Sequence, residues 1–179
     1  MTFAQTMLDY IARRDHGVMR TVHRWPAPRW IRYWMLCATR GGDGWLWGLL
    51  ALVLLLAGGP GRFRAVGEAA MASALGVVLF REIKRRTGRR RPCVLEPHCW
   101  STLLPPDQFS FPSGHTITAF AVCTPVWFHY PEALALLLFC AASVGVSRII
   151  LGMHFLSDVL AGAVLGTAAG WGVHRLFAL

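Results

Sequence analysis

Residues 45–59 read WLWGLLALVLLLAGG, a stretch made of Leu, Ala, Val, Trp and Gly without a single charged side chain. Such a run is typical of a helix that crosses a bilayer, which needs about 20 apolar residues. Four further apolar stretches have comparable lengths. The expected spans are residues 43–60, 65–83, 113–131, 132–150 and 156–177. The sequence therefore predicts an all-α fold, a polytopic transmembrane bundle of about five spanning helices.

The composition of the whole chain also indicates lipid as the solvent. Of its 179 residues, 55% are hydrophobic and only 15% are charged, whereas about a quarter is usual in a soluble domain. The formal net charge is nevertheless +9. Because the basic residues lie between apolar segments, anionic lipid headgroups or a phosphate substrate are favoured as partners, and nucleic acid is disfavoured.

The N-terminal segment, residues 1–42, differs from the membrane domain expected over 43–179. Apolar and charged residues alternate in it, as in an amphipathic helix that lies in the membrane interface. The apolar ones are Met7, Ile11, Met19 and Val22. Residues 30–39 are too short to cross, and GGDG at 41–44 predicts a turn. No cleavable leader is expected, because the first ten residues hold no long apolar run.

One long connection, residues 84–112, carries the densest charge and several prolines, which predicts an ordered, irregular and functional loop. Cys93 and Cys99 within it could close a disulfide outside the cytoplasm, whereas free thiols would fit a reducing compartment. Adding His98 gives too few ligands for a metal site.

The apolar spans contain residues with a structural interpretation. Cys123 and Cys140 are expected to be free, buried thiols. Glu68 is expected near a membrane interface, because charge at membrane depth is costly. Three glycines share one face of the last span and are expected to pack inside the bundle rather than form a dimer seam. They are Gly162, Gly166 and Gly170.

With five spans, the 84–112 loop and the 148–156 junction emerge on one membrane face. The polar residues gathered there are Lys84, Arg91, Ser113, His115, Arg148, His154 and Asp158. Phosphoryl transfer needs cations and donors around the oxygens of the transferred group. Three of these residues are cations, and Ser113 with the Gly114 N–H lies where a helix is expected to start, a position that favours anions.

Two histidines could carry out the reaction itself. One imidazole attacks phosphorus and the other protonates the leaving alkoxide. His154 is the candidate nucleophile, because Asp158 one turn later can hold its other ring nitrogen. His115 has no carboxylate nearby in sequence and is the candidate acid. Each residue alone could equally contact lipid headgroups, but the three clusters together favour a phosphate site.

These residues resemble a known three-part signature. Three segments carry it: Lys84-x6-Arg91-Pro92, Pro112-Ser113-Gly114-His115, and Ser147-Arg148-x5-His154-x3-Asp158. They are similar, at every fixed position and in order, to the motifs of the type 2 phosphatidic acid phosphatases. That superfamily also includes soluble bacterial acid phosphatases and vanadium haloperoxidases. The resemblance covers roughly residues 65–177.

The resemblance implies a metal-independent, cofactor-free mechanism through a phosphohistidine on His154. It implies His115 as general acid and Asp158 as the partner of His154. The phosphate-binding residues that it implies are Lys84, Arg91, Ser113, Gly114 and Arg148. Membrane members act on phosphatidic acid, phosphatidylglycerol phosphate, or polyprenyl phosphates and pyrophosphates.

The expected function is therefore hydrolysis of a lipid phosphate by an integral membrane protein, in a bacterial inner membrane. A lipid phosphotransferase that uses the same phosphohistidine is the second interpretation. A non-enzymatic protein that binds anionic lipids is the third, and it is disfavoured because no catalytic residue of the signature is missing. The choice of lipid and the oligomeric state stay open.

Two lines of reasoning give opposite predictions for the side of the membrane on which the site lies. Many bacterial members of the family have six spans and a site outside the cytoplasm. Five spans place the N-terminus on the face of the site, which then holds all but three of the 18 Lys and Arg residues. The exceptions are Arg62, Arg64 and Arg175. By the positive-inside rule, this face is cytoplasmic.

Overall fold

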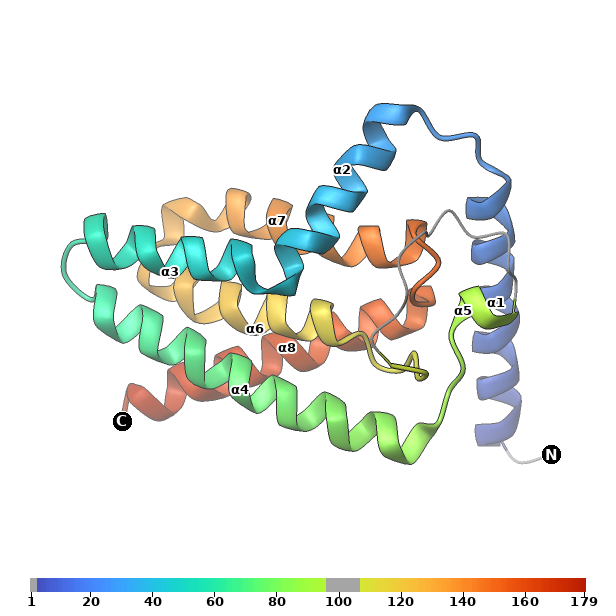
Figure 1. The fold of residues 1–179 in the computed structure, drawn as a ribbon. Helices are drawn as coiled ribbons and strands as arrows, with labels where there is room; N and C mark the ends of the chain where they lie inside the picture. The colour runs from blue at the N-terminus through green and yellow to red at the C-terminus, as the bar shows by residue number, and fades with distance from the viewer. Residues whose placement is uncertain (1–2, 96–106) are drawn as a thin grey trace.

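The structure is a computed structural model that describes residues 3–95 and 107–179. These residues form helices, and the β contact among them is an isolated bridge between Arg90 and Phe109. Long helices run alongside one another as a bundle, and one helix lies across its end (Figure 1). The predicted all-α class is confirmed.

The helices follow one another in a simple order. They are α1 (Phe3–Arg24), α2 (Arg29–Arg40), a π-helical turn η1 (Gly41–Trp45), α3 (Leu46–Ala57), α4 (Arg62–Thr87), the short α5 (Pro92–Leu95), α6 (Gly114–His129), a 3-10 turn η2 (Pro131–Ala133), α7 (Leu134–Ile150) and α8 (Leu156–Phe177).

Among the described residues, four helical segments are long and apolar enough to cross a membrane. They are Arg29–Ala57, Arg62–Thr87, Pro131–Ile150 and Leu156–Phe177. The fifth expected span, 113–131, forms α6, which has only 16 residues. It nevertheless lies in the middle of the bundle, between α4 and α8.

The first span is longer than expected, because α2 continues through η1 into α3. Residues 30–39 were expected to be too short to cross, but they are part of this longer segment. Gly44, with φ of 124°, bends the chain in the GGDG turn, a conformation that costs glycine little because it lacks Cβ. As a result α2 leans away from the axis of α3 (Figure 1).

Close packing of α8 on α6 depends on the glycine face. A Cβ at Gly162 would lie 2.9 Å from the carbonyl oxygen of Ser113, and one at Gly170 would lie 2.7 Å from the Cβ of Thr124. Both distances are too short for a side chain. The glycine face therefore packs inside the bundle, as predicted.

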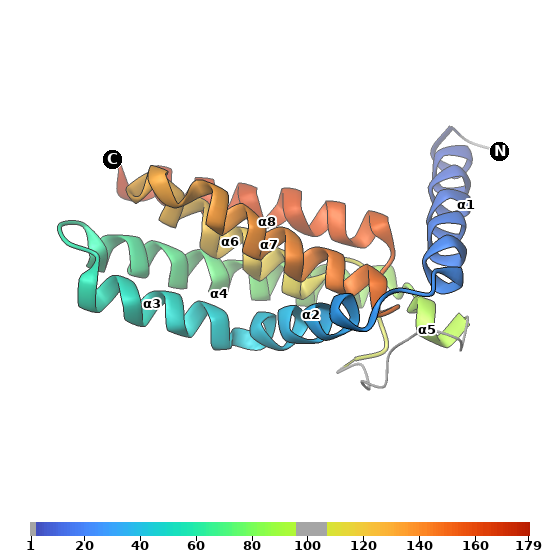
Figure 2. The same ribbon diagram turned by 90° about the horizontal axis from the view of Figure 1, so that it is seen from above.

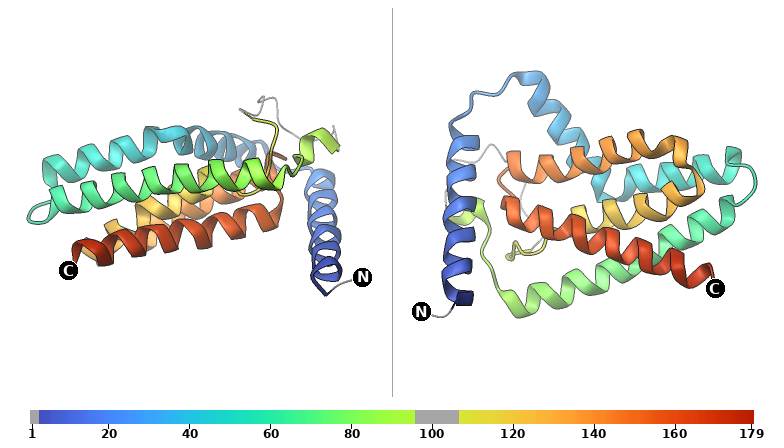
Figure 3. Two further views of the ribbon diagram at one scale, coloured as in Figure 1. Left: turned by 90° about the horizontal axis from the view of Figure 1, so that it is seen from below. Right: turned by 180° about the vertical axis from the view of Figure 1, so that it is seen from behind.

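Helix α1 crosses the end of the bundle near α5, and the C-terminus lies at the opposite end (Figures 2 and 3). Met19 of α1 is buried with Ile149, Phe155 and Val159. Met19 therefore packs α1 against the bundle. The interfacial position of α1 as a whole stays a prediction.

The cysteines agree with the sequence analysis only in part. Cys123 is free and buried, whereas Cys140 is free but partly exposed. Cys93 is also free, and the Cys99 and His98 positions lie outside the described residues.

Candidate active site

The predicted residues converge at the end of the bundle where α1 and α5 lie. Lys84 belongs to the last turns of α4, which runs to Thr87, so it lies on a helix and not in the loop where it was expected. A cavity of about 480 Å³ opens at this end. Six predicted residues line it: Lys84, Arg91, Gly114, His115, Arg148 and His154.

Ser113 and Asp158 are fully buried behind the cavity wall. The Ser113 N–H donates to the Asp158 carbonyl over 3.1 Å, and its hydroxyl accepts from the Thr116 hydroxyl at 2.9 Å. Ser113 therefore joins the start of α6 to the start of α8. It does not line the cavity with the other predicted phosphate ligands.

Two of the three cations are held by Asp107, a residue that the sequence analysis did not single out. Its carboxylate accepts from Lys84 Nζ at 2.7 Å and from the guanidinium of Arg91 at 2.8 Å. Burial opposes ionisation of Asp107, but the hydrogen bonds from Lys84 and Arg91 outweigh it and lower the pKa of the carboxyl. Asp107 is therefore an anion that draws both cations together at the cavity.

Arg148 is the third cation, and its surroundings differ. It is only 4% exposed, and its guanidinium donates to the hydroxyl of Thr39 on α2. Its Nε has no hydrogen-bond partner, and no carboxylate of the described residues forms an ion pair with it. A buried cation without a counter-ion is costly, so an anion bound in the cavity would stabilise this side chain.

His154 lies next to these cations and is 1% exposed. Its Nε2 is 3.1 Å from a guanidinium nitrogen of Arg91, which also donates to the Met153 carbonyl. Since a guanidinium can only donate, Nε2 accepts and Nδ1 carries the proton. Burial, and after it the charges of Arg91, Arg148 and Lys84, lowers the pKa of His154 well below its ordinary value. The imidazole is therefore neutral, with a lone pair on Nε2.

The predicted contact between His154 and Asp158 is present but loose. His154 Nδ1 is 3.6 Å from Asp158 Oδ2, which is too long for a hydrogen bond. The same carboxylate oxygen accepts from the Phe155 N–H at 2.8 Å. Hydrogen bonds at active sites often tighten only when substrate binds.

Asp158 is held in place by Arg89, a cation that does not line the cavity. Arg89 donates to Asp158 Oδ1 at 2.7 Å and to Asp15 Oδ2 of α1 at 2.7 Å. Asp15 also accepts from the Ser157 N–H at 3.0 Å. Helix α1 is thereby tied to the start of α8, next to the carboxylate that faces His154.

His115 lies at the start of α6. Its Nε2 is 2.7 Å from Asp43 Oδ1 in the η1 turn, and both residues line the cavity. The sequence analysis gave His115 no carboxylate, because Asp43 is 72 positions away along the chain. Burial first, and then the charge of Arg148, lowers the pKa of His115 to about 4, and the contact with Asp43 opposes both by supporting the protonated form.

The comparison with known families agrees with this arrangement. A sequence profile described as the PAP2 superfamily matches residues 65–179, which include all eight predicted site residues. The chain belongs to the PAP2 superfamily. As its apolar helices also indicate, it is an integral membrane protein.

Curated relatives of this PAP2 protein carry names of lipid phosphatases. It is 30% identical over 122 residues to the lipid A 1-phosphatase of Rhizobium etli, an alignment that covers 60% of this chain and 51% of the relative. It is 34% identical over 131 residues to the decaprenylphosphoryl-5-phosphoribose phosphatase of Mycobacterium tuberculosis, covering 71% and 68%. The chain spans about half or less of the length of the lipid A 1-phosphatases it matches.

Two solved structures of PAP2 proteins share the fold. The crystal structure of Aquifex aeolicus LpxE has a TM-score of 0.74 and 27% identity, over 89% of this chain and 93% of that one. The transmembrane PAP2 type phosphatidylglycerolphosphate phosphatase of Bacillus subtilis has a TM-score of 0.72 over 94% and 87%. At 20% identity, this second likeness shows the fold alone.

The PAP2 signature did not contain every residue that shapes the site. Asp43, Asp107, Arg89 and Asp15 were missed as partners of the predicted residues. One sequence signal was present for Asp43, since an acidic residue between glycines at the start of an apolar run lies near a membrane interface. Arg89 lies in a basic run, Asp15 lies in a helix, and Asp107 follows two prolines, and none of these surroundings carries a comparable signal.

Proposed function

We propose that this protein is a lipid phosphatase that hydrolyses a phosphate monoester or pyrophosphate of a membrane lipid through a phosphohistidine on His154. One observation carries the proposal. Lys84, Arg91 and Arg148 line a single cavity with the neutral His154, and Arg148 has no counter-ion among the described residues. Cations around a neutral imidazole suit attack on a phosphoryl group.

The reaction takes place in two steps. Nε2 of His154 attacks phosphorus, the bond to the ester oxygen breaks, and His115 gives its proton to that leaving oxygen. Water then attacks the phosphohistidine, His115 accepts a proton from the water, and inorganic phosphate leaves with His154 restored. Asp158 stabilises the positive charge on the imidazole ring, and the three cations stabilise the charge on the equatorial oxygens.

The proposed substrate has an apolar chain. A second cavity of about 170 Å³ lies between α3, α4 and α6, and Ser73 lines both it and the catalytic cavity. Its wall is apolar and includes Trp47, Leu50, Leu54, Val66, Val122 and Val126. A lipid whose phosphate lies among the cations can therefore place its hydrocarbon chain in the apolar cavity along α3 and α4. The names of the lipid A 1-phosphatase and the decaprenylphosphoryl-5-phosphoribose phosphatase support a phosphorylated membrane lipid as the substrate.

The first experiment is phosphate release by the purified protein from a panel of lipids, with and without EDTA. The panel contains phosphatidic acid, phosphatidylglycerol phosphate, lipid A, and undecaprenyl phosphate and pyrophosphate. EDTA-resistant release from one of them is expected, because no step of the proposed reaction uses a metal. Release from none of them, followed by transfer once an acceptor lipid is added, would replace the phosphatase by a lipid phosphotransferase.

Replacing Asp43, the partner of His115, should slow turnover most for substrates whose leaving group needs protonation. In Asp43→Asn the support for protonated His115 is lost, and turnover of a lipid phosphate is expected to fall by about 10-fold to 100-fold, within the contribution of general acid catalysis. Turnover of p-nitrophenyl phosphate, whose leaving group needs no protonation, should fall much less. Equal losses on both substrates would contradict the assignment of His115 as the acid.

The membrane face of the site can be decided through the C-terminus. Helix α8 begins at the catalytic end and finishes at the other end of the bundle (Figure 1). A fluorescent protein fused after Leu179 is expected to fluoresce if the catalytic end lies outside the cytoplasm, as the family precedent predicts. It should stay dark if the catalytic end is cytoplasmic, as the distribution of Lys and Arg predicts.

A further inference from the structure

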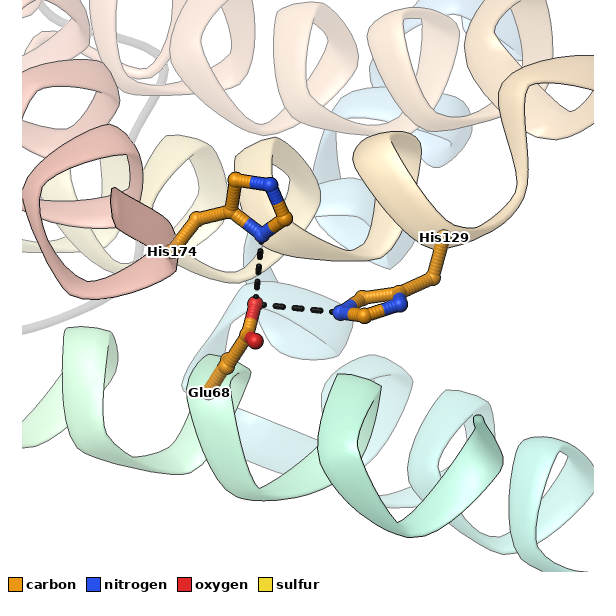
Figure 4. A group of neighbouring side chains, drawn as sticks. All are labelled: Glu68, His129 and His174. Atoms are coloured by element: carbon orange, nitrogen blue, oxygen red, sulfur yellow. Dashed lines mark hydrogen bonds and ion pairs between the residues drawn. The ribbon is translucent and has the colours of Figure 1, made fainter. Parts of the chain in front are cut away.

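Three side chains meet at the end of the bundle opposite the catalytic cavity. Glu68 lies in the second turn of α4, His129 is the last residue of α6, and His174 lies near the end of α8. Figure 4 shows both imidazoles directed at the same carboxylate. The sequence analysis expected Glu68 merely near an interface, but its side chain is fully buried within this group.

The distances within the group fit a metal ion. Glu68 Oε2 is 2.8 Å from His174 Nδ1 and 3.1 Å from His129 Nε2. All three candidate ligand atoms lie within 4.8 Å of one another. In a tetrahedral zinc site with ligand bonds of about 2.0–2.1 Å, neighbouring ligand atoms are roughly 3.3–3.4 Å apart. The two contacts of Glu68 with the histidines therefore need to lengthen by only a few tenths of an ångström, and the two imidazole nitrogens already lie within 4.8 Å of each other.

The surroundings hold the ligands in this geometry. Arg64 binds the other oxygen of Glu68, Oε1, at 2.8 Å, which leaves Oε2 to the histidines. The ring of His174 stacks on Phe128 at 4.2 Å between centroids. Neighbours that orient a ligating carboxylate and imidazole are characteristic of metal sites. Arg64 itself is 44% exposed, so that solvent screens its charge.

We propose that Glu68, His129 and His174 bind a divalent transition-metal ion of the Zn²⁺ class. Two imidazoles with one carboxylate suit such an ion, whereas Mg²⁺ and Ca²⁺ prefer oxygen ligands. Each imidazole presents an unprotonated nitrogen to the ion and keeps its proton on the other ring nitrogen. The histidines are 17% and 19% exposed, so water can reach the site and supply a fourth ligand.

The ion would join the helices that build the catalytic end. The three ligands belong to α4, α6 and α8, and the same helices carry Lys84, His115 and Asp158 at their other ends. Binding to the folded state alone raises its stability. The ion would thus stabilise the bundle without taking part in the reaction, and EDTA should lower the thermal midpoint but not the initial rate.

The test uses the full-length protein in detergent, made metal-free with a chelator that is then removed. Zn²⁺ alone is titrated by calorimetry, bound metal is counted after dialysis, and Co²⁺ alone is added to record its absorption spectrum. We expect one ion per chain, a higher thermal midpoint and the intense bands of four-coordinate Co²⁺. Affinity should fall as the pH is lowered, because protons compete for both imidazoles.

Variants at both ends of the molecule locate the site. Glu68→Gln and His174→Ala should each lose the ion, whereas His154→Ala, at the catalytic end, should keep it while losing turnover. Helical circular dichroism of the metal-free variants confirms that they fold. The proposal is overturned if the wild type binds no ion, or if binding survives in folded Glu68→Gln and is lost in His154→Ala. None of these outcomes depends on the lipid phosphatase assignment.

Discussion

Phosphate release by the His154→Ala variant is expected to fall by at least about 10³-fold, since removal of a catalytic nucleophile costs this much or more. The neutral imidazole of His154 lines the cavity together with the three cations. The single lone pair on Nε2 accepts from Arg91 at 3.1 Å, and it attacks phosphorus once the guanidinium turns from this nitrogen to the phosphoryl oxygens.

The measurement compares kcat on the preferred lipid with trapping of the intermediate. Wild-type protein quenched in alkali during turnover of ³²P-labelled substrate should carry an acid-labile, alkali-stable label, as expected for a phosphohistidine. The variant should carry none. His23→Ala is the matched control, since His23 lies on α1 and does not line the catalytic cavity. Full labelling of His154→Ala, or turnover near the wild-type rate, would show that another residue is the nucleophile.

The cavity could be predicted largely from the spacing of the signature. Lys84, Arg91, His115, Arg148 and His154 all reach it because helix ends at one face of a bundle must meet. The partners of these residues could not be predicted in the same way. Asp43 reaches His115 only because Gly44 bends the chain between α2 and α3. GGDG at 41–44 predicted the turn itself, but the residue that Asp43 meets depends on packing across the bundle, which no local pattern encodes.

The helices likewise include features that could be predicted from the sequence and features that could not. The glycine face of α8 was predicted from its four-residue spacing and packs on α6 as expected. The extension of the first span through α2 was not predicted, because Arg29, Arg32 and Arg40 lower its apparent apolarity. The partners of Glu68 were not predicted either. A single acidic residue gives no sign of two histidines that lie 61 and 106 positions further along the chain.

Replacement of Arg148 by glutamine is expected to lower kcat/KM by about 10²-fold to 10³-fold and to stabilise the protein. The loss follows because one preorganised donor to the phosphoryl oxygens disappears. The gain follows because Arg148 is a buried cation with no ion-pair partner among the described residues. Removing such a charge relieves its desolvation cost, and about 0.5–2 kcal/mol in the free energy of unfolding is common where stability has been exchanged for function.

Arg91→Gln provides the contrast that makes this result informative. Arg91 is equally buried but donates to Asp107 and the Met153 carbonyl. Its loss leaves the buried Met153 carbonyl without this donor and removes one of the two cations that bind Asp107, so this variant should lose activity and also thermal stability. Thermal midpoints at one scan rate, with and without inorganic phosphate, separate the two cases. Phosphate should raise the midpoint of the wild type because it binds the folded state, and it should raise that of Arg148→Gln much less. If Arg148→Gln instead unfolds as early as Arg91→Gln and responds to phosphate like the wild type, Arg148 is a structural residue, and the buried cation no longer supports a phosphate site.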